Sequence, residues 1–221
     1  MHKSRRSLIS LLCYYAVILV LVMIISPSFF SASNFTSIFR STATTLVAAP
    51  MGMLLVLLVG EIDVSVGSIL AMCCVVSGKL ALSGVPLAGI VLASIAVGGL
   101  MGLINGSVVT FLHLDSIVAT LGLLSIYKGI RIIWTSGAWL TGFPSDFLAL
   151  GQGTLFGVNY TIYIAVAVML LMWLVTTRTT FGRNCYAVGS NAKAAHLCSI
   201  HVNRTKILAF VICGCLVGLT A

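Results

Sequence analysis

"PLAGIVLASIAVGGLMGLINGSVVTFL", residues 86–112, contains no charged side chain. A helix rises about 1.5 Å per residue, so about 20 apolar residues cross the hydrocarbon core of a bilayer. Gly98, Gly102 and Gly106 recur at every fourth position, which puts them on one face of a helix, where small residues let a neighbouring helix approach closely. We therefore predict a membrane-spanning helix that packs through this glycine face.

The rest of the chain has the same character. Of its 221 residues 60% are hydrophobic and only 7% are charged, and the mean hydropathy is +1.17, which is outside the range of soluble domains. The sequence therefore predicts an all-α integral membrane protein in which residues 1–221 form a single transmembrane domain. We expect six or seven spans, because the second and third segments are either separate or one broken element. The predicted spans are 8–26, 43–59, 62–82, 86–112, 116–134, 159–177 and 205–221.

The N-terminal segment "MHKSRRS" and the apolar run after it resemble the start of a secretory signal. The apolar run is long, however, and no A-x-A-like cleavage site follows it. An uncleaved first span is the favoured interpretation.

Metal, disulfide and catalytic sites have little support in the pattern of cysteines, histidines and acids. The seven cysteines show no C-x-x-C spacing, and the four histidines show no spacing with the four acidic residues that suggests a catalytic set. We therefore expect no catalytic residues, no metal and no cofactor in this chain.

The net charge of +8 comes mainly from basic residues that flank the predicted spans, which argues against a nucleic-acid surface. One cluster precedes the first span, and a second lies in residues 178–206. The positive-inside rule places both clusters in the cytoplasm, and the six spans between them agree with this because six is an even number. The Gly-rich segment 135–158 then lies outside, where we expect a short helix or re-entrant turn.

The segment "GEIDVSVGS", residues 60–68, holds two of the four acidic residues. Pro50 and Gly60 predict a kink or break just before it, and broken helices often surround the cavities of transporters. Glu61, Asp63 and Ser65 are therefore candidates for the substrate pathway. Two alternatives remain for Asp63: a helix cap that accepts hydrogen bonds from the N–H groups of residues 65 and 66, or a proton relay.

Residues 179–206, "TTFGRNCYAVGSNAKAAHLCSIHVNRTK", form the longest stretch without a spanning pattern on the predicted cytoplasmic side. Residues 191–200 can form a short amphipathic helix, with Asn191 as its N-cap and one apolar side. The members of that side are Ala194, Ala195, Leu197 and Cys198. The helix either contacts another protein or lies against lipid.

Four segments in order, "IDVSVGS" (62–68), "NGSVVTFLHLDSIVATLG" (105–122), "YKGIRIIWTSGAW" (127–139) and "FGRNCYAVGSNAKAAHLCSI" (181–200), resemble the permease subunits of ribose-type bacterial ABC importers. "WTSGAWLTGFP" resembles the autoinducer-2 branch, with rhamnose-type permeases as the nearest competitor. Glu61 departs from the resemblance, since an uncharged residue is expected there. Members of the family are also longer, with about ten spans, so we expect this chain to be incomplete at its C-terminus.

The resemblance implies a multi-pass protein of the bacterial inner membrane that pairs with a second permease as a homo- or heterodimer. It also implies a separate cytoplasmic ABC ATPase and a periplasmic solute-binding protein. The loop 178–206 matches the segment that couples the permease to the ATPase. The residues implied for that contact are Phe181, Gly182, Arg183, Gly189, Asn191, Ala194, Ala195, Leu197 and Ile200.

The function expected from this resemblance is ATP-driven import of a small sugar-like solute, either autoinducer-2 or a monosaccharide such as ribose or rhamnose. No catalysis is expected in this chain, because the ATPase partner hydrolyses ATP. The alternatives are a truncated relative that is nonfunctional or modifies assembly, and an intramembrane enzyme.

Overall fold

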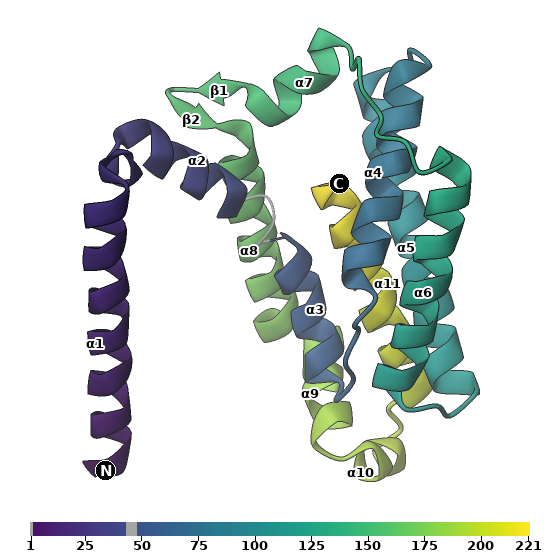
Figure 1. The fold of residues 1–221 in the computed structure, drawn as a ribbon. Helices are drawn as coiled ribbons and strands as arrows, with labels where there is room; N and C mark the ends of the chain where they lie inside the picture. The colour runs from purple at the N-terminus through teal and green to yellow at the C-terminus, as the bar shows by residue number, and fades with distance from the viewer. Residues whose placement is uncertain (1, 43–47) are drawn as a thin grey trace. The chain divides into compact units, whose positions relative to one another are not determined.

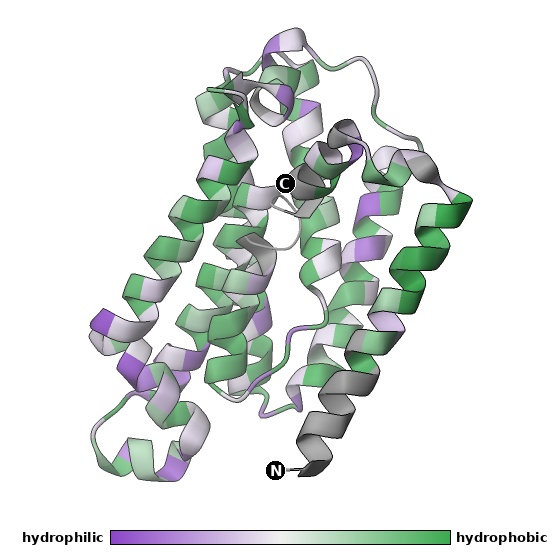
Figure 2. Ribbon diagram, turned by 90° about the vertical axis from the view of Figure 1, so that its left-hand side faces the viewer, coloured by the Kyte–Doolittle hydropathy of each residue, from purple (hydrophilic) through white to green (hydrophobic). Residues whose placement is uncertain are grey.

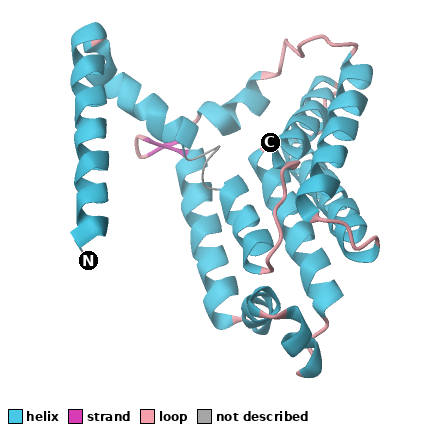
Figure 3. Cartoon of the chain, turned by 60° about the horizontal axis from the view of Figure 1, so that its bottom comes forward, coloured by secondary structure: helices cyan, strands magenta, loops and turns pink. Residues whose placement is uncertain are grey.

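A computed structural model describes residues 2–42 and 48–221 of the protein. These residues are almost entirely helical (Figure 3), which confirms the predicted all-α fold. The exception is a hairpin of two short antiparallel strands, β1 (Thr154–Leu155) and β2 (Val158–Asn159). The chain divides after Thr42 into two compact units, which are described separately below.

The N-terminal unit contains the helix α1 (His2–Ile25), the 3-10 helix η1 (Pro27–Phe30) and the helix α2 (Ala32–Thr42). The amide of Asn34 donates to the carbonyl oxygen of Phe29 at 2.8 Å and so closes the turn between α1 and α2. The predicted first span, 8–26, coincides with α1 as far as Ile25. The apolar side chains near its C-terminal end, such as Ile24 and Ile25, are well exposed, as expected for a helix whose solvent is lipid.

The second unit is a bundle of helices that follows the predicted spans closely. Among its described residues, four helices are long and apolar enough to cross a membrane: α5, α6, α8 and α11. Figure 2 shows that hydrophobic residues cover the middle of the long helices, while hydrophilic residues lie mostly toward their ends. The bounds are α3 (Ala48–Leu58), α4 (Val66–Leu82), α5 (Leu87–Phe111), α6 (Ser116–Thr135), α7 (Ser145–Gln152), α8 (Tyr160–Arg178), α9 (Thr180–Ser190), α10 (Ala192–Leu197) and α11 (Val202–Thr220).

Helix α11 lies in the middle of this bundle, between α3 on one side and α4 and α5 on the other (Figure 1). Two clusters of buried side chains both include residues of α11. Phe210 and Val217 join a cluster with α4, α5 and α6, whereas Ala209 and Leu216 join one with α3, α8 and α9. The apolar core of the bundle is therefore organised around the predicted seventh span.

Contacts between distant residues define two ends of the bundle. At the end that we call the loop end, the turn after α3 lies beside α9, the start of α6 and the start of α11. At the opposite end, which we call the hairpin end, the ammonium of Lys79 donates to the carbonyl oxygen of Trp134 at 3.0 Å. Gly78 there packs against Phe143 in the segment that leads to α7 and the hairpin.

The second and third predicted spans form a broken element rather than two long helices. Residues 43–47 of the span predicted at 43–59 lie outside the described residues, and α3 itself has 11 residues, too few to cross a bilayer. Pro50 lies within α3, which continues as helix to Leu58, so the chain does not break at this proline. The irregular backbone comes later, at residues 59–65, where Gly60 adopts a φ of +81°.

Candidate functional site

The segment predicted to be a cytoplasmic loop contains two helices at the loop end of the bundle. Asn191 caps α10, as predicted, by accepting a hydrogen bond from the N–H of Ala194 at 3.0 Å. This helix is shorter than the predicted 191–200 and ends at Leu197, because the backbone turns left-handed at Ser199 with a φ of +61°. Helix α9 is capped by Thr179, which accepts from the N–H of Gly182 at 3.1 Å.

The sequence reasoning missed α9. Its apolar side chains Phe181, Cys185 and Val188 are spaced four and three residues apart, which is the spacing of one helix face. That signal was present in the sequence. It was obscured by the glycines at 182 and 189, which favour a loop when read one at a time.

The inner side of α9 and α10 packs onto the bundle. Cys185 and Val188 are buried against the cluster that also contains Leu55 of α3 and Met172 of α8, and Phe181 and Ile200 pack at its margin. Gly182 lies directly against the backbone of Val175 and Thr176, with no room for a side chain. Burial also raises the pKa of the Cys185 thiol to about 11.

The outer side of the two helices is exposed. Its composition differs from the apolar side that was predicted for residues 191–200. Leu197 is 86% exposed, and Ala194 and Cys198 are exposed with it. Ala195 is 5% exposed and packs in the buried cluster with Cys185 and Val188, so it faces the bundle instead of sharing the exposed surface with Leu197. The exposed apolar surface is therefore centred on Leu197 alone, with Tyr186 of α9 53% exposed nearby in sequence.

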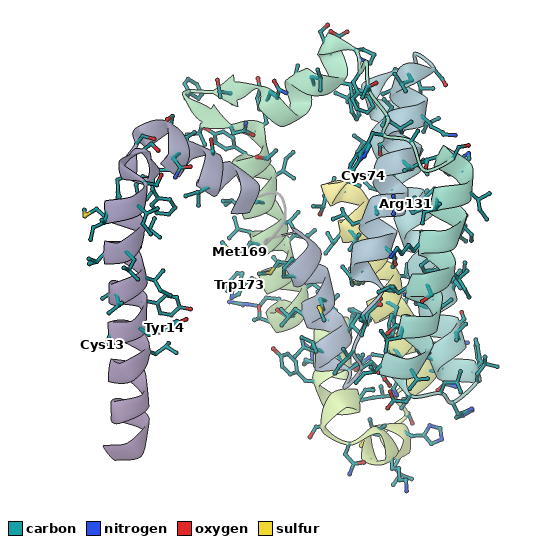
Figure 4. All side chains as sticks on the ribbon, in the orientation of Figure 1. Cys13, Tyr14, Cys74, Arg131, Met169 and Trp173 are labelled. Carbon is teal, nitrogen blue, oxygen red and sulfur yellow. The ribbon has the colours of Figure 1, made fainter. Side chains whose placement is uncertain are left out.

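Lys193 and His196 lie beside Leu197 in the lining of one groove. Arg183 and Lys193 are exposed on α9 and α10, and nitrogen-tipped side chains gather at this end of the bundle (Figure 4). A groove of about 620 Å³ runs between the end of α10 and the start of α11, and a second of about 480 Å³ lies beside Leu197. Side chains lining them include His196, Asn203, His201, Arg204 and Lys193.

The backbone of α9 is in direct contact with the backbone of the turn after α3. A Cβ atom placed on Gly189 would collide with the carbonyl oxygen of Leu58 and would lie 3.3 Å from the nitrogen of Gly60. On the other side, a Cβ on Gly60 would lie 3.7 Å from the Cα of Gly189. Only glycine fits at position 189 without moving the turn.

Glu61 lies in that turn and forms an ion pair with Lys206, near the start of α11. Both side chains are largely shielded, with exposed fractions of 13% for Glu61 and 23% for Lys206. The structure thus places Glu61, a candidate pathway residue in the sequence, at the loop end beside α9. Its partner is 145 residues away in sequence, so no local pattern pairs the two.

Asp63 and Ser65 are buried in a polar cluster between α4, α5 and α6. The Oδ1 atom of Asp63 accepts from the N–H and the hydroxyl of Ser65, at 2.8 and 2.7 Å, and Oδ2 accepts from the Asn105 amide at 3.0 Å. The side-chain oxygen Oδ1 of Asn105 accepts from the hydroxyl of Tyr127 at 2.8 Å. Of the two predicted cap bonds the structure has the one from the N–H of Ser65, and Ser65 itself is the N-cap residue of α4. Asp63 therefore shapes the turn before the helix and ties it to α5 and α6.

The predicted glycine face of α5 lies against α11. A Cβ on Gly98 would collide with the carbonyl oxygen of Gly214, and one on Gly102 with that of Phe210. At Gly106 the nearest atom is the Cα of Ile207 at 3.0 Å. Sequence reasoning missed the matching pair on α11, Gly214 and Gly218, although these residues have the same spacing of four.

Within residues 2–42 and 48–221, no three histidine, cysteine, aspartate or glutamate side chains gather closely enough to hold a metal ion. The polar groups that do converge, at 61–65 and on α5, α6 and α11, bind one another. Their arrangement is that of a structural connection through the bundle.

Residues 34–221 match the family described as the permease component of the branched-chain amino acid transport system. The chain belongs to this permease family. Membership agrees with the long apolar helices and with the resemblance drawn from the four sequence segments.

The names of similar proteins refer to a different transported solute from the one in the family description. The autoinducer 2 import system permease protein LsrC of Escherichia coli O9:H4 (strain HS) is 35% identical over 98% of this chain. LsrC of Yersinia pseudotuberculosis is 36% identical over 99%. The chain spans 63% and 61% of these relatives' lengths, respectively. No solved structure matches this permease.

Proposed function

We propose that this chain is a membrane-spanning permease subunit of an ATP-driven importer and forms part of the pathway for a small sugar-like solute. Autoinducer-2 is the favoured solute, because the relatives named above are permeases for its import. A monosaccharide such as ribose or rhamnose is the alternative. The chain supplies the pathway wall, and a separate ABC ATPase hydrolyses ATP.

The observation that carries this proposal is the position of α9 and α10. They lie at one end of the bundle, their inner side is buried on α3, α8 and α11, and their outer side exposes Leu197 among basic side chains. An apolar side chain that projects so far from a helix is suited to a pocket on a partner, while the surrounding charges bias orientation. We propose that the partner is the cytoplasmic ATPase.

The remaining parts of the assembly follow from the same proposal. The loop end and the N-terminus face the cytoplasm of a bacterial inner membrane, and the hairpin end faces the periplasm, where a solute-binding protein delivers its ligand. A second permease subunit, identical or homologous, completes the pathway. The basic residues Arg178, Arg183, Lys193 and Arg204 support this orientation, because they lie at the loop end.

Leu197→Asp tests the contact in the importer expressed with its ATPase and binding protein. We expect ATPase binding to weaken about thirtyfold and uptake to fall with it, the effect of losing one central apolar anchor. Co-purification of the ATPase and ATP-dependent uptake of radiolabelled solute measure the result. Phe156→Asp is the matched control for co-purification, since Phe156 is 93% exposed in the β1–β2 hairpin at the other end.

Normal ATPase co-purification by the Leu197→Asp variant would contradict the proposal. The α10 helix would then be an interfacial helix that lies against lipid.

A further inference from the structure

The turn at residues 59–65 connects the loop end to the interior of the bundle, and this connection suggests a role beyond holding the fold. We propose that the turn receives the displacement of α9 and passes it to α4, α5 and α6, and that the ion pair between Glu61 and Lys206 is the positioning contact that keeps the turn engaged. This inference rests on the proposed function, in which α9 and α10 contact the ATPase.

The first step is the contact between α9 and the turn. Gly189 touches the carbonyl of Leu58 and approaches Gly60 with no side chain between the two backbones. Side chains yield by changing rotamer, whereas packed backbones do not. A shift of α9 toward the bundle therefore has to move residues 58–60.

The second step is the ion pair, which holds the turn in place at a second point. Glu61 follows the glycine that touches α9, and Lys206 lies near the start of α11, which α10 leads into. The turn is thus held from two directions by the same loop: through Gly189 before α10, and through Lys206 after it. Because both charged groups are largely shielded from solvent, water screens their attraction less than it would on an open surface.

The third step is a series of hydrogen bonds from the turn to the helices beyond it. The N–H of Ile62 donates to the hydroxyl of Ser116, and the N–H of Val64 donates to the hydroxyl of Thr120, both at 3.1 Å. These bonds attach the turn to α6. Asp63 and Asn105 attach it to α5, so three helices are joined to one short segment.

A continuous set of contacts shows where coupling can travel, and a coupling measurement decides whether it does. The appropriate quantity is the number of solute molecules imported per ATP hydrolysed. A contact that serves only stability changes the amount of folded importer but leaves this ratio unchanged. A contact that transmits displacement changes the ratio while the ATPase stays bound.

Glu61→Gln and Lys206→Met, made separately, test the ion pair in the importer reconstituted in liposomes with its ATPase and binding protein. We expect the solute-to-ATP ratio to fall about two- to thirtyfold, the range for a residue within a coupled network, with normal ATPase co-purification. The double variant Glu61→Lys with Lys206→Glu restores the attraction with reversed charges, and we expect it to recover most of the ratio.

Gly189→Ala tests the backbone contact independently of charge. The added methyl group has to push residues 58–60, so we expect a similar fall in the ratio. Gly122→Ala is the control, because Gly122 lies on α6 with nothing within 4 Å of the added carbon, and its ratio should match the wild type.

An unchanged ratio in both single charge variants overturns the inference, as does a reversed pair no better than the worse single variant. These results leave the proposed function intact as long as wild-type importer binds ATPase through Leu197. If the Leu197→Asp variant binds ATPase normally, the proposed function fails, and the inference that rests on it fails too.

Discussion

Asp63 shows how a carboxylate is kept inside an apolar bundle. A charged aspartate costs about 2.5–3.5 kcal/mol on insertion scales at the bilayer centre, which is an upper bound for Asp63 because its turn lies at the loop end. Its three hydrogen bonds, two from Ser65 and one from Asn105, each contribute about 1.5–3 kcal/mol when the acceptor is charged. Together they offset the insertion cost, so the residue stabilises the turn before α4 rather than weakening it.

The two cysteines of the loop end differ in reactivity for a physical reason. Cys185 is fully buried, and burial raises the pKa of its thiol to about 11, whereas Cys198 is exposed. At pH 8 only about one Cys185 thiol in a thousand is the reactive thiolate. In variants that keep a single cysteine, we expect maleimide to label Cys198 readily and Cys185 hardly at all, as measured by mass shift.

The same shift links stability to pH. The folded protein holds the Cys185 proton more tightly than the unfolded chain, whose thiol pKa is about 8.5. The stabilisation is complete below about pH 8.5 and is lost as the pH rises toward 11.

Rapid labelling of Cys185 at pH 7 would show that α9 does not pack on the bundle as described.

At the scale of the elements, the pairing of α5 with α11 depends on the absence of side chains. A Cβ on Gly102 would lie 2.9 Å from the carbonyl carbon of Phe210 and 3.1 Å from the Cα of Val211, so any added group meets backbone. At Gly106 one of the two nearest atoms is the Cβ of Phe210, a side-chain atom, at 3.1 Å. The tolerance for added volume therefore increases along the face from Gly102 to Gly106.

Gly102→Leu should consequently destabilise the protein much more than Gly106→Ala. We expect a loss of about 3 kcal/mol or more for the leucine, the upper range for overpacking, and a smaller loss for the alanine. Thermal unfolding of the purified protein in detergent measures both. Gly122→Leu is the size-matched control, because its side chain meets open space. Wild-type stability of the Gly102→Leu variant would mean that the 98/102/106 face points to lipid.

At the scale of the whole molecule, the two ends of the bundle predict sidedness. Four long helices, α4, α5, α6 and α8, cross the bundle between the turn at 59–65 and α9, and this even number brings the two segments together at the loop end. We expect Lys193→Cys to react with a membrane-impermeant thiol reagent only from the cytoplasm and Phe156→Cys only from the periplasm. The opposite pattern would invert the proposed orientation.

Sequence reasoning was successful where the cause of a structure is local. Long apolar runs predicted the helices because lipid leaves the backbone no other partners, and Asn191 was recognised as a cap because it binds the N–H group three residues away. The partner of the glycine face, the Glu61–Lys206 pair and the Asp63–Asn105 bond could not be predicted. Their members lie far apart in sequence, and periodicity identifies a face without identifying what covers it.

The central position of α11 has a consequence for biosynthesis. The ribosome makes α3 to α8 before α11, yet both buried clusters include α11 side chains. At about 5–20 residues per second, the interval between the end of α5 and the start of α11 lasts roughly ten seconds. During that time the glycine face of α5 has no helix to meet, so the helices made earlier lie in the bilayer without their central partner until α11 is made.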